Sequence, residues 1–178
     1  MKDLKIFDIP FVGLKEGSHL FTYQIDKKFF EAFQFDEFDD TNIIATLNFV
    51  KKSTFFELSF AIKGTVNVPC DSTGEPFDLK IDGGLDLVVQ FGYEYNDEHD
   101  EILILPHERY QLNVAQYVYE SIVLSVPNRR VHPDVLNGTM ESEAFQRLNK
   151  LKIKDEKIVE EVSTDPRWDK LKDLLTDK

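Results

Sequence analysis

The segment TFFELSFAIKGTVNV, residues 54–68, decides the fold class. Apolar and polar residues alternate along it, and every second position carries a large apolar side chain: Phe56, Leu58, Phe60 and Ile62. A period of two is typical of a β-strand that buries one face and exposes the other. The segment therefore predicts one long strand with a core side and a solvent side.

The segments around this strand have the same character. Residues 43–50 precede it across Lys51-Lys52-Ser53, a loop of hairpin length. Residues 77–91 alternate as well, around a Gly83-Gly84 break that predicts a bulge or a bend in a long, curved strand. Two shorter strands are predicted at residues 19–25 and 101–105. The pattern indicates strands joined by short loops, and so an antiparallel sheet.

The period changes in the second half of the chain. Apolar residues recur at every fourth position, at Val114, Val118, Ile122 and Val126. This predicts a helix over residues 113–125, capped by Asn113 and ended by Pro127. Further helices are predicted over residues 27–33 (after the cap Asp26), over residues 141–151, and from residue 164 or 165 onward. Strands first and helices last predict an α+β fold, a mainly antiparallel, curved β-sheet of long strands with C-terminal helices packed on it.

Length and charge divide the chain into two parts. It has 178 residues, which suggests one domain with a tail, and its net charge is −12. The excess of acid lies in residues 1–149, whereas residues 150–178 hold equal numbers of basic and acidic residues. We predict a single α+β domain over residues 1–149. Residues 150–178 are predicted to form a charged linker and a terminal helix that docks on the body.

Composition also excludes several classes of protein. Coating of DNA and attachment to anionic membranes both need clustered Lys and Arg, which an acidic body lacks. The lone cysteine, Cys70, rules out an internal disulfide and a zinc site with several cysteines. No apolar run is long enough for a membrane span or a signal segment. We expect a cytoplasmic protein that binds neither DNA nor membrane.

Motifs that would carry catalysis or bind a cofactor are missing from the sequence. It has no Gly-rich phosphate loop, no nucleophile elbow and no zinc-protease motif. The acidic stretch at residues 96–101 lacks the pattern of a Ca²⁺ loop and is interpreted as a solvated connection between strands. Cys70 is interpreted as a buried thiol in a sheet turn. We therefore expect no enzyme activity, no catalytic or metal-binding residue and no cofactor.

Basic and aromatic residues are the candidates for contact with a partner or with RNA. They are Arg129, Arg130, Lys150, Lys152, Lys154, Arg167 and Trp168. Arginine forks suit phosphate and carboxylate groups, although Arg129 and Arg130 also follow a predicted helix whose dipole they would complement. Trp168 either docks the tail on the body or anchors a partner.

Three stretches together resemble one known family. They are Gly64–Phe77 (GTVNVPCDSTGEPF), Gln111–Pro127 (QLNVAQYVYESIVLSVP) and Asp165–Leu171 (DPRWDKL), and the opening Ile9–Phe21 also fits. In this order and spacing they resemble the YceD family, the large ribosomal RNA accumulation proteins of bacteria and plastids. The resemblance implies a role in accumulation of 23S ribosomal RNA and in ribosome biogenesis, and it implies no catalytic activity. Its motif residues here are Cys70, Asp165, Pro166 and Arg167.

The sequence departs from this family at the cysteines. Many members carry a C-x-x-C pair and a second cysteine cluster, which suggests a metal site. Here Cys70 matches the first cysteine, Thr73 replaces the second, and residues 132–164 contain none. We therefore expect a variant of the family without a Cys-type zinc site.

Two functional readings follow from the sequence. The first is a non-enzymatic factor that supports 23S rRNA accumulation, whose partner is large-subunit rRNA or a basic ribosomal protein. Because the body is acidic, RNA contact would be confined to Arg129, Arg130 and the lysines of residues 150–157. The alternative is an acidic scaffold that binds a basic partner without touching RNA. A hydrolase that uses paired carboxylates is the weakest reading, since no defined spacing supports it.

Overall fold

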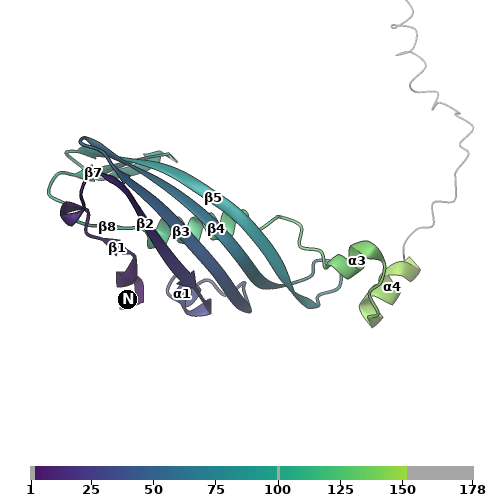
Figure 1. Cartoon of the computed structure of the whole chain (residues 1–178). Coiled ribbons are helices and arrows are strands. Elements are labelled where there is room, and N and C mark those ends of the chain that lie inside the picture. Colours follow the sequence, from purple (N-terminus) through teal and green to yellow (C-terminus); the bar gives the residue numbers. More distant parts are fainter. Residues whose placement is uncertain (1–2, 100, 152–178) are drawn as a thin grey trace, which may run out of the picture.

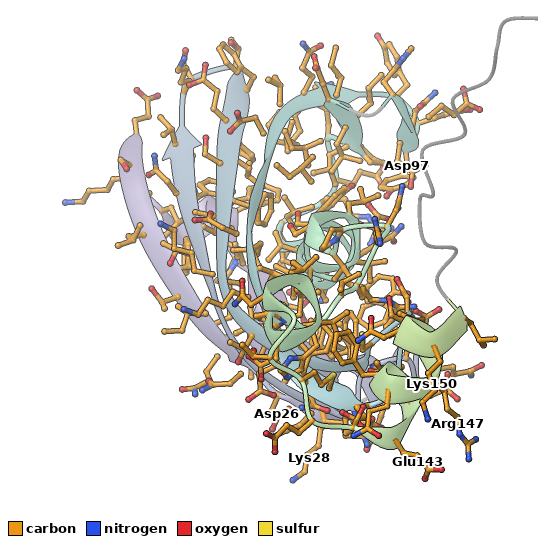
Figure 2. The ribbon with its side chains drawn as sticks, turned by 90° about the vertical axis from the view of Figure 1, so that its right-hand side faces the viewer. Asp26, Lys28, Asp97, Glu143, Arg147 and Lys150 are labelled. Carbon is orange, nitrogen blue, oxygen red and sulfur yellow. The ribbon has the colours of Figure 1, made fainter. Side chains whose placement is uncertain are left out.

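The computed structural model describes residues 3–99 and 101–151 of the chain. Its main feature is an open six-stranded sheet with the order β2-β3-β4-β5-β7-β6, which arches over the helix α2 (Figures 1 and 2). The strands of this sheet are β2 (Gly17–Ile25), β3 (Asp40–Lys51), β4 (Phe55–Pro69), β5 (Pro76–Gly92), β6 (Asn96–His99) and β7 (Ile102–Pro106). The fold is α+β, as predicted.

Shorter elements complete the body. Two short strands, β1 (Asp8–Ile9) and β8 (Leu112–Asn113), pair with each other in a separate antiparallel ladder. The helices are α1 (Lys27–Glu31), α2 (Ala115–Ser125), α3 (Pro133–Asn137) and α4 (Glu143–Leu151), and two 3₁₀ turns, η1 (Asp3–Phe7) and η2 (Phe11–Gly13), lie near the start of the chain. None of the described helices has the length and apolarity needed to cross a bilayer.

The predicted central strand is confirmed as β4. It pairs antiparallel with β3 on one side and β5 on the other, so the three longest strands form a meander of hairpins. The predicted core positions Phe56, Leu58, Phe60 and Ile62 are all buried. The period-two pattern therefore identified the correct face of the sheet.

Of the bulge or bend predicted at Gly83-Gly84, the bulge is wrong. The pairing of β5 with β4 runs through both glycines without a register shift, with Gly83 opposite Ile62 and Gly84 opposite Ala61. The glycines serve close packing instead: a Cβ on Gly83 would collide with the Ser125 side chain, and one on Gly84 would lie 2.6 Å from the Phe60 carbonyl oxygen. The strand curves as a whole (Figure 1).

The end of the sheet differs from the prediction in two respects. Residues 96–99, interpreted as part of a solvated connection, form the strand β6, which pairs antiparallel with β7. The strand β7 then pairs with β5 in parallel, over Val88–Gly92. The otherwise antiparallel sheet thus contains one parallel pair, β5 with β7, because the chain first forms β6 at the outer edge and then returns as β7 between β6 and β5.

The helix α2 packs its predicted apolar stripe on the sheet. Val114, Val118 and Ile122 are all fully buried. The helix begins at Ala115 rather than at the predicted Asn113, which belongs to β8. The Asn113 side chain nevertheless acts as a cap, since its Oδ1 accepts the Ala115 N–H at 3.0 Å.

The other helices follow the predictions less closely. α1 ends at Glu31 instead of residue 33, and the Asp26 side chain makes no capping bond. α4 begins at Glu143 instead of residue 141, with the Ser142 hydroxyl accepting the Phe145 N–H. The pattern did not predict α3. α3 and α4 lie beyond the end of the sheet (Figure 1), and the helix predicted from residue 164 lies outside the described residues, so the division into residues 1–149 and 150–178 stays a prediction.

Candidate functional site

The turn between β4 and β5 carries the lone cysteine. The Cys70 N–H donates to the Glu75 carbonyl at 2.8 Å, and the Gly74 N–H donates to the Cys70 carbonyl at 2.7 Å. Gly74 adopts φ 74°, the left-handed conformation that glycine accepts without a steric penalty. The turn is thus closed by its own backbone, and it presents Cys70 and Asp71 to the segment that follows α2.

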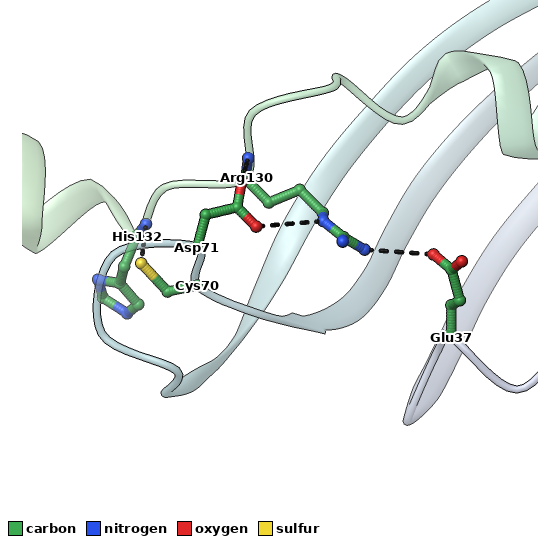
Figure 3. Close-up of polar contacts among 5 residues, drawn as sticks. All are labelled: Glu37, Cys70, Asp71, Arg130 and His132. Carbon is green, nitrogen blue, oxygen red and sulfur yellow. Dashed lines mark hydrogen bonds and ion pairs between the residues drawn. The ribbon is translucent and has the colours of Figure 1, made fainter.

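Arg130 ties that segment to the turn. Its N–H donates to Asp71 Oδ2 at 2.6 Å, and its carbonyl accepts the Asp71 N–H at 2.8 Å. The guanidinium lies 3.7 Å from Asp71 Oδ1 and 3.5 Å from Glu37 Oε2 (Figure 3). Arg130 therefore joins three loops of the body. This predicted contact for a partner is already engaged by internal carboxylates, and only 26% of its side chain is exposed.

The Cys70 thiol is buried, as predicted. Its Sγ accepts the His132 N–H at 3.3 Å (Figure 3). Burial alone would raise the thiol pKa, but hydrogen bonds from the His132 backbone, the Thr73 side chain and the backbone of Ser72 and Thr73 outweigh burial and lower the pKa below its ordinary value. With 2% of the residue exposed, this thiol holds the turn together and offers little access to a substrate.

The residues around Cys70 do not fit a Cys-type zinc ion. Zinc of this class needs several thiolates or imidazoles in a tetrahedron. Thr73 supplies a hydroxyl where a second thiol would be needed, and its Oγ1 lies 3.5 Å from the Glu75 N–H. His132 uses its Nδ1 to accept the Asp134 N–H at the start of α3. Among the described residues there is no group of three or more potential metal ligands.

The remaining predicted contact residues are scattered. Arg129 is exposed on the segment between α2 and α3, and it forms no ion pair with another described residue. Lys150 is exposed in the last turn of α4 and points outward, near Arg147 and Glu143 (Figure 2). The other predicted residues lie outside the described residues: Lys152, Lys154, Asp165, Pro166, Arg167 and Trp168.

A groove between α2, β5 and β6 was not predicted. Its volume is about 760 Å³, and it is open to solvent. It is lined by Asp82, Gly83, Gly84, Leu85, Asp97, His99, Gln116, Tyr117, Glu120, Ser121, Leu124 and Ser125. Three acidic residues from three different elements, Asp82, Asp97 and Glu120, are among the lining residues, and no lysine or arginine is. The groove is therefore acidic.

Asp97 and Glu120 form no ion pair with another described residue. Asp97 accepts the Tyr95 hydroxyl at 3.0 Å, and Glu120 accepts the Gln116 amide at 2.9 Å. Asp82 lies 3.6 Å from Lys63 in a pair that is largely exposed. Burial, with further contributions from Tyr95, Asp97 and Glu120, raises the pKa of the Tyr117 hydroxyl.

The sequence held only a weak signal for this groove. Gln116 and Glu120 are four apart on the polar side of a predicted helix, which places them on one face. Nothing in the pattern placed Asp82 and Asp97 beside that face, because their positions depend on which strands pair. The four groups meet through the tertiary fold alone.

Comparison with family models matches residues 58–175, more than half of the chain, to the family described as large ribosomal RNA subunit accumulation protein YceD. No curated protein and no solved structure matches the chain. The matched range contains the Cys70 turn, the Arg130–Asp71 pair and every residue that lines the acidic groove, whereas Glu37, the other partner of Arg130, lies outside it.

Proposed function

The chain belongs to the YceD family of large ribosomal RNA subunit accumulation proteins, and from this premise we propose that it is a non-enzymatic cytoplasmic factor supporting 23S rRNA accumulation and large-subunit biogenesis. The family match is the observation that carries the proposal. The buried, hydrogen-bonded state of Cys70 supports a structural role for the one thiol of the chain.

The proposal is tested in the cell. We expect deletion of the gene to lower 23S rRNA relative to 16S rRNA, and to lower free and assembled large subunits on sucrose gradients. The intact gene, supplied in trans, restores both. A deletion strain with normal 23S rRNA and normal large subunits contradicts the proposal.

Direct contact with RNA is tested by a matched pair of arginines. Arg129 is exposed and unpaired among the described residues, whereas Arg130 bridges Asp71 and Glu37. If RNA contact is direct, Arg129→Ala lowers crosslinking to rRNA in cells. It changes the free energy of unfolding by no more than about 0.5 kcal/mol, as is usual for a surface substitution. Arg130→Ala instead lowers the free energy of unfolding by about 1 kcal/mol, because two partly exposed ion pairs are lost.

A second candidate function is favoured by the acidic groove. The alternative is a scaffold that binds a basic partner protein and affects rRNA indirectly. The carboxylates of Asp97 and Glu120 in the groove would attract lysine and arginine and repel phosphate. Affinity purification with and without ribonuclease separates the two functions. Partners that survive the nuclease support the scaffold, and partners that leave with the RNA support direct binding.

A further inference from the structure

The strand β5 has an open edge beside the acidic groove. On one side it pairs with β4 from Pro76 to Gln90. On the other side, among the described residues, it pairs only with β7, from Val88 to Gly92. In Figure 1, β7 covers one end of β5 and the rest of the strand runs on without it. Residues 78–86 thus have one backbone side unpaired among the described residues, and residues 82–85 of this stretch line the groove.

The register identifies which backbone groups face this edge. The Val88 N–H points away from β4, since it donates to the Glu101 carbonyl at 2.8 Å. Backbone groups alternate sides along a strand, and the pairing with β4 has no shift. The N–H and C=O groups of Lys80, Asp82, Gly84 and Asp86 therefore face the edge. Within the described residues, none of them takes part in a hydrogen bond across it.

Apolar surface and negative charge lie beside these unpaired groups. The opposite wall of the groove is α2, whose Leu124 is 81% exposed and whose Glu120 carries a carboxylate. Asp97 on β6, labelled in Figure 2, also lines the groove, and Asp82 lies on β5 with its carboxylate on the outer face of the sheet, 3.6 Å from Lys63. An unpaired edge, an apolar wall and the carboxylates of Asp97 and Glu120 therefore border one groove.

We propose that the open edge of β5 binds a lysine- or arginine-rich extended segment of a partner protein as an added β-strand. The backbone of the segment hydrogen-bonds to residues 78–86, and basic side chains on its helix-facing side meet Asp97 and Glu120. This deepens the proposed function and rests on it for the source of the segment, a basic protein of the large subunit. Binding to the edge does not depend on that source.

The chemistry of the groove favours a peptide over the other possible occupants. A peptide backbone offers alternating donors and acceptors, which match the edge of a sheet, whereas a phosphate backbone offers acceptors only. Phosphates would also be repelled by the carboxylates. A second copy of this edge would bring the same carboxylates against each other.

The first test measures binding of a model peptide to the full chain. The probe is a fluorescent peptide of alternating lysine and valine, about eight residues long, which is a typical strand length. We expect fluorescence anisotropy to show saturable binding that weakens as salt rises. The same peptide with alternate backbone nitrogens methylated, or with glutamate in place of lysine, binds at least about tenfold more weakly. Equal binding of the methylated peptide overturns the proposal.

The second test uses variants of the groove. Asp82→Pro removes an edge N–H without removing a bond to β4, and Asp82→Asn keeps the N–H while removing the charge. We expect the proline to weaken binding about tenfold more than the asparagine. The double variant Asp97→Asn/Glu120→Gln weakens binding about tenfold, since exposed charge pairs each contribute modestly. The matched control Glu31→Gln/Asp36→Asn removes two exposed charges outside the groove and leaves binding unchanged.

Hydrogen exchange at backbone amides of the wild-type chain tests the proposal even if Asp82→Pro does not fold. In the wild-type chain, the peptide is expected to slow exchange at Lys80, Asp82, Gly84 and Asp86 specifically. Unchanged exchange at these amides overturns the proposal. Protection of the same amides by single-stranded RNA also overturns it. A third contrary result is a chain ending at Leu151 that binds the peptide when the full chain does not, because residues 152–178 would then compete with the peptide for the edge. These measurements use purified protein, so they test peptide binding separately from the cellular role. The peptide can fail to bind although 23S rRNA depends on the gene, and it can bind although deletion of the gene leaves 23S rRNA unchanged.

Discussion

At the scale of single residues, Tyr23 buries its hydroxyl without a hydrogen-bond partner among the described residues. Its ring stacks on Phe7 with the centroids 4.7 Å apart, and 7% of the residue is exposed. Burial raises the pKa of Tyr23 to about 12. Packing of the Tyr23 ring therefore stabilises the fold by more than burial of its unpaired hydroxyl destabilises it.

Replacing Tyr23 by phenylalanine tests this cost. Because no hydrogen bond is lost, we expect the free energy of unfolding near pH 7 to stay equal or rise by up to about 1 kcal/mol. Tyr23 stays protonated in both states below pH 10. Between pH 10 and 12 the unfolded tyrosine ionises while the folded one does not, so the wild type loses stability there and Tyr23→Phe loses less.

Urea unfolding at several alkaline pH values measures the difference. Tyr93→Phe is the control, because Tyr93 is 99% exposed. An identical alkaline loss of stability in the wild type and Tyr23→Phe would contradict the assignment.

Arg129 and Arg130 show what sequence alone could and could not predict at a site. Their adjacency identified the densest basic point of the body, and the sequence assigned both the same role. The structure gives Arg130 two carboxylate partners, Glu37 and Asp71, which lie far from it in the sequence. Such pairing depends on how loops meet in the fold, so no local pattern contains it.

At the scale of elements, the contact between β5 and α2 depends on Gly83. The end of the helix approaches the strand so closely that Ser125 occupies the place of a Gly83 side chain. Ser125 is itself fixed, since its hydroxyl donates to the Ser121 carbonyl one turn earlier. Gly83 and Ser125 also line the acidic groove.

We expect Gly83→Ala to push α2 away from the sheet and to lower the free energy of unfolding by about 1–3 kcal/mol, the usual cost of overpacking. Thermal melting followed by circular dichroism measures the change. Gly13→Ala is the matched control, because a Cβ there meets no atom within 4 Å. Equal melting temperatures for the two variants would show that Ser125 moves aside at no cost.

The elements themselves were largely predictable, but their partners were less so. Period-two alternation identified β3, β4 and β5 within a few residues, and the four-residue spacing identified α2, because these patterns report which side of an element is buried. No sequence pattern predicted the parallel pairing of β7 with β5 or the pairing of β1 with β8. Alternation specifies a face of a strand, and it does not specify the neighbour at its edge.

At the scale of the whole molecule, charge is the dominant feature. The net charge of −12 comes from the body, and the described ion pairs neutralise few of its carboxylates. Mutual repulsion of like charges opposes a compact state. The same excess of negative charge attracts a basic partner. Added salt therefore raises the stability of the chain and weakens its binding to such a partner.

We therefore expect the melting temperature to rise as NaCl is raised from about 10 mM to about 200 mM, since the screening length falls from about 30 Å to below 10 Å. Calorimetry of the full chain measures the shift, and sucrose at equal osmolality is the control because it does not screen charge. A melting temperature that is insensitive to salt, or that falls with it, would mean that favourable ion pairs outweigh repulsion.

The small ladder between β1 and β8 has a consequence for how the chain reaches its native state. It pairs Ile9 with Leu112, and the Asn113 side chain binds Asp8 and the Leu4 carbonyl. The meander from β2 to β5 has short-range contacts and can form hairpin by hairpin during synthesis. The first strand, by contrast, has no partner until more than a hundred residues have been translated. The backbone of β1 therefore stays unpaired through most of translation, although the Phe7 ring can already pack on Tyr23 and Phe29, and pairing with β8 joins the two ends of the body late in folding.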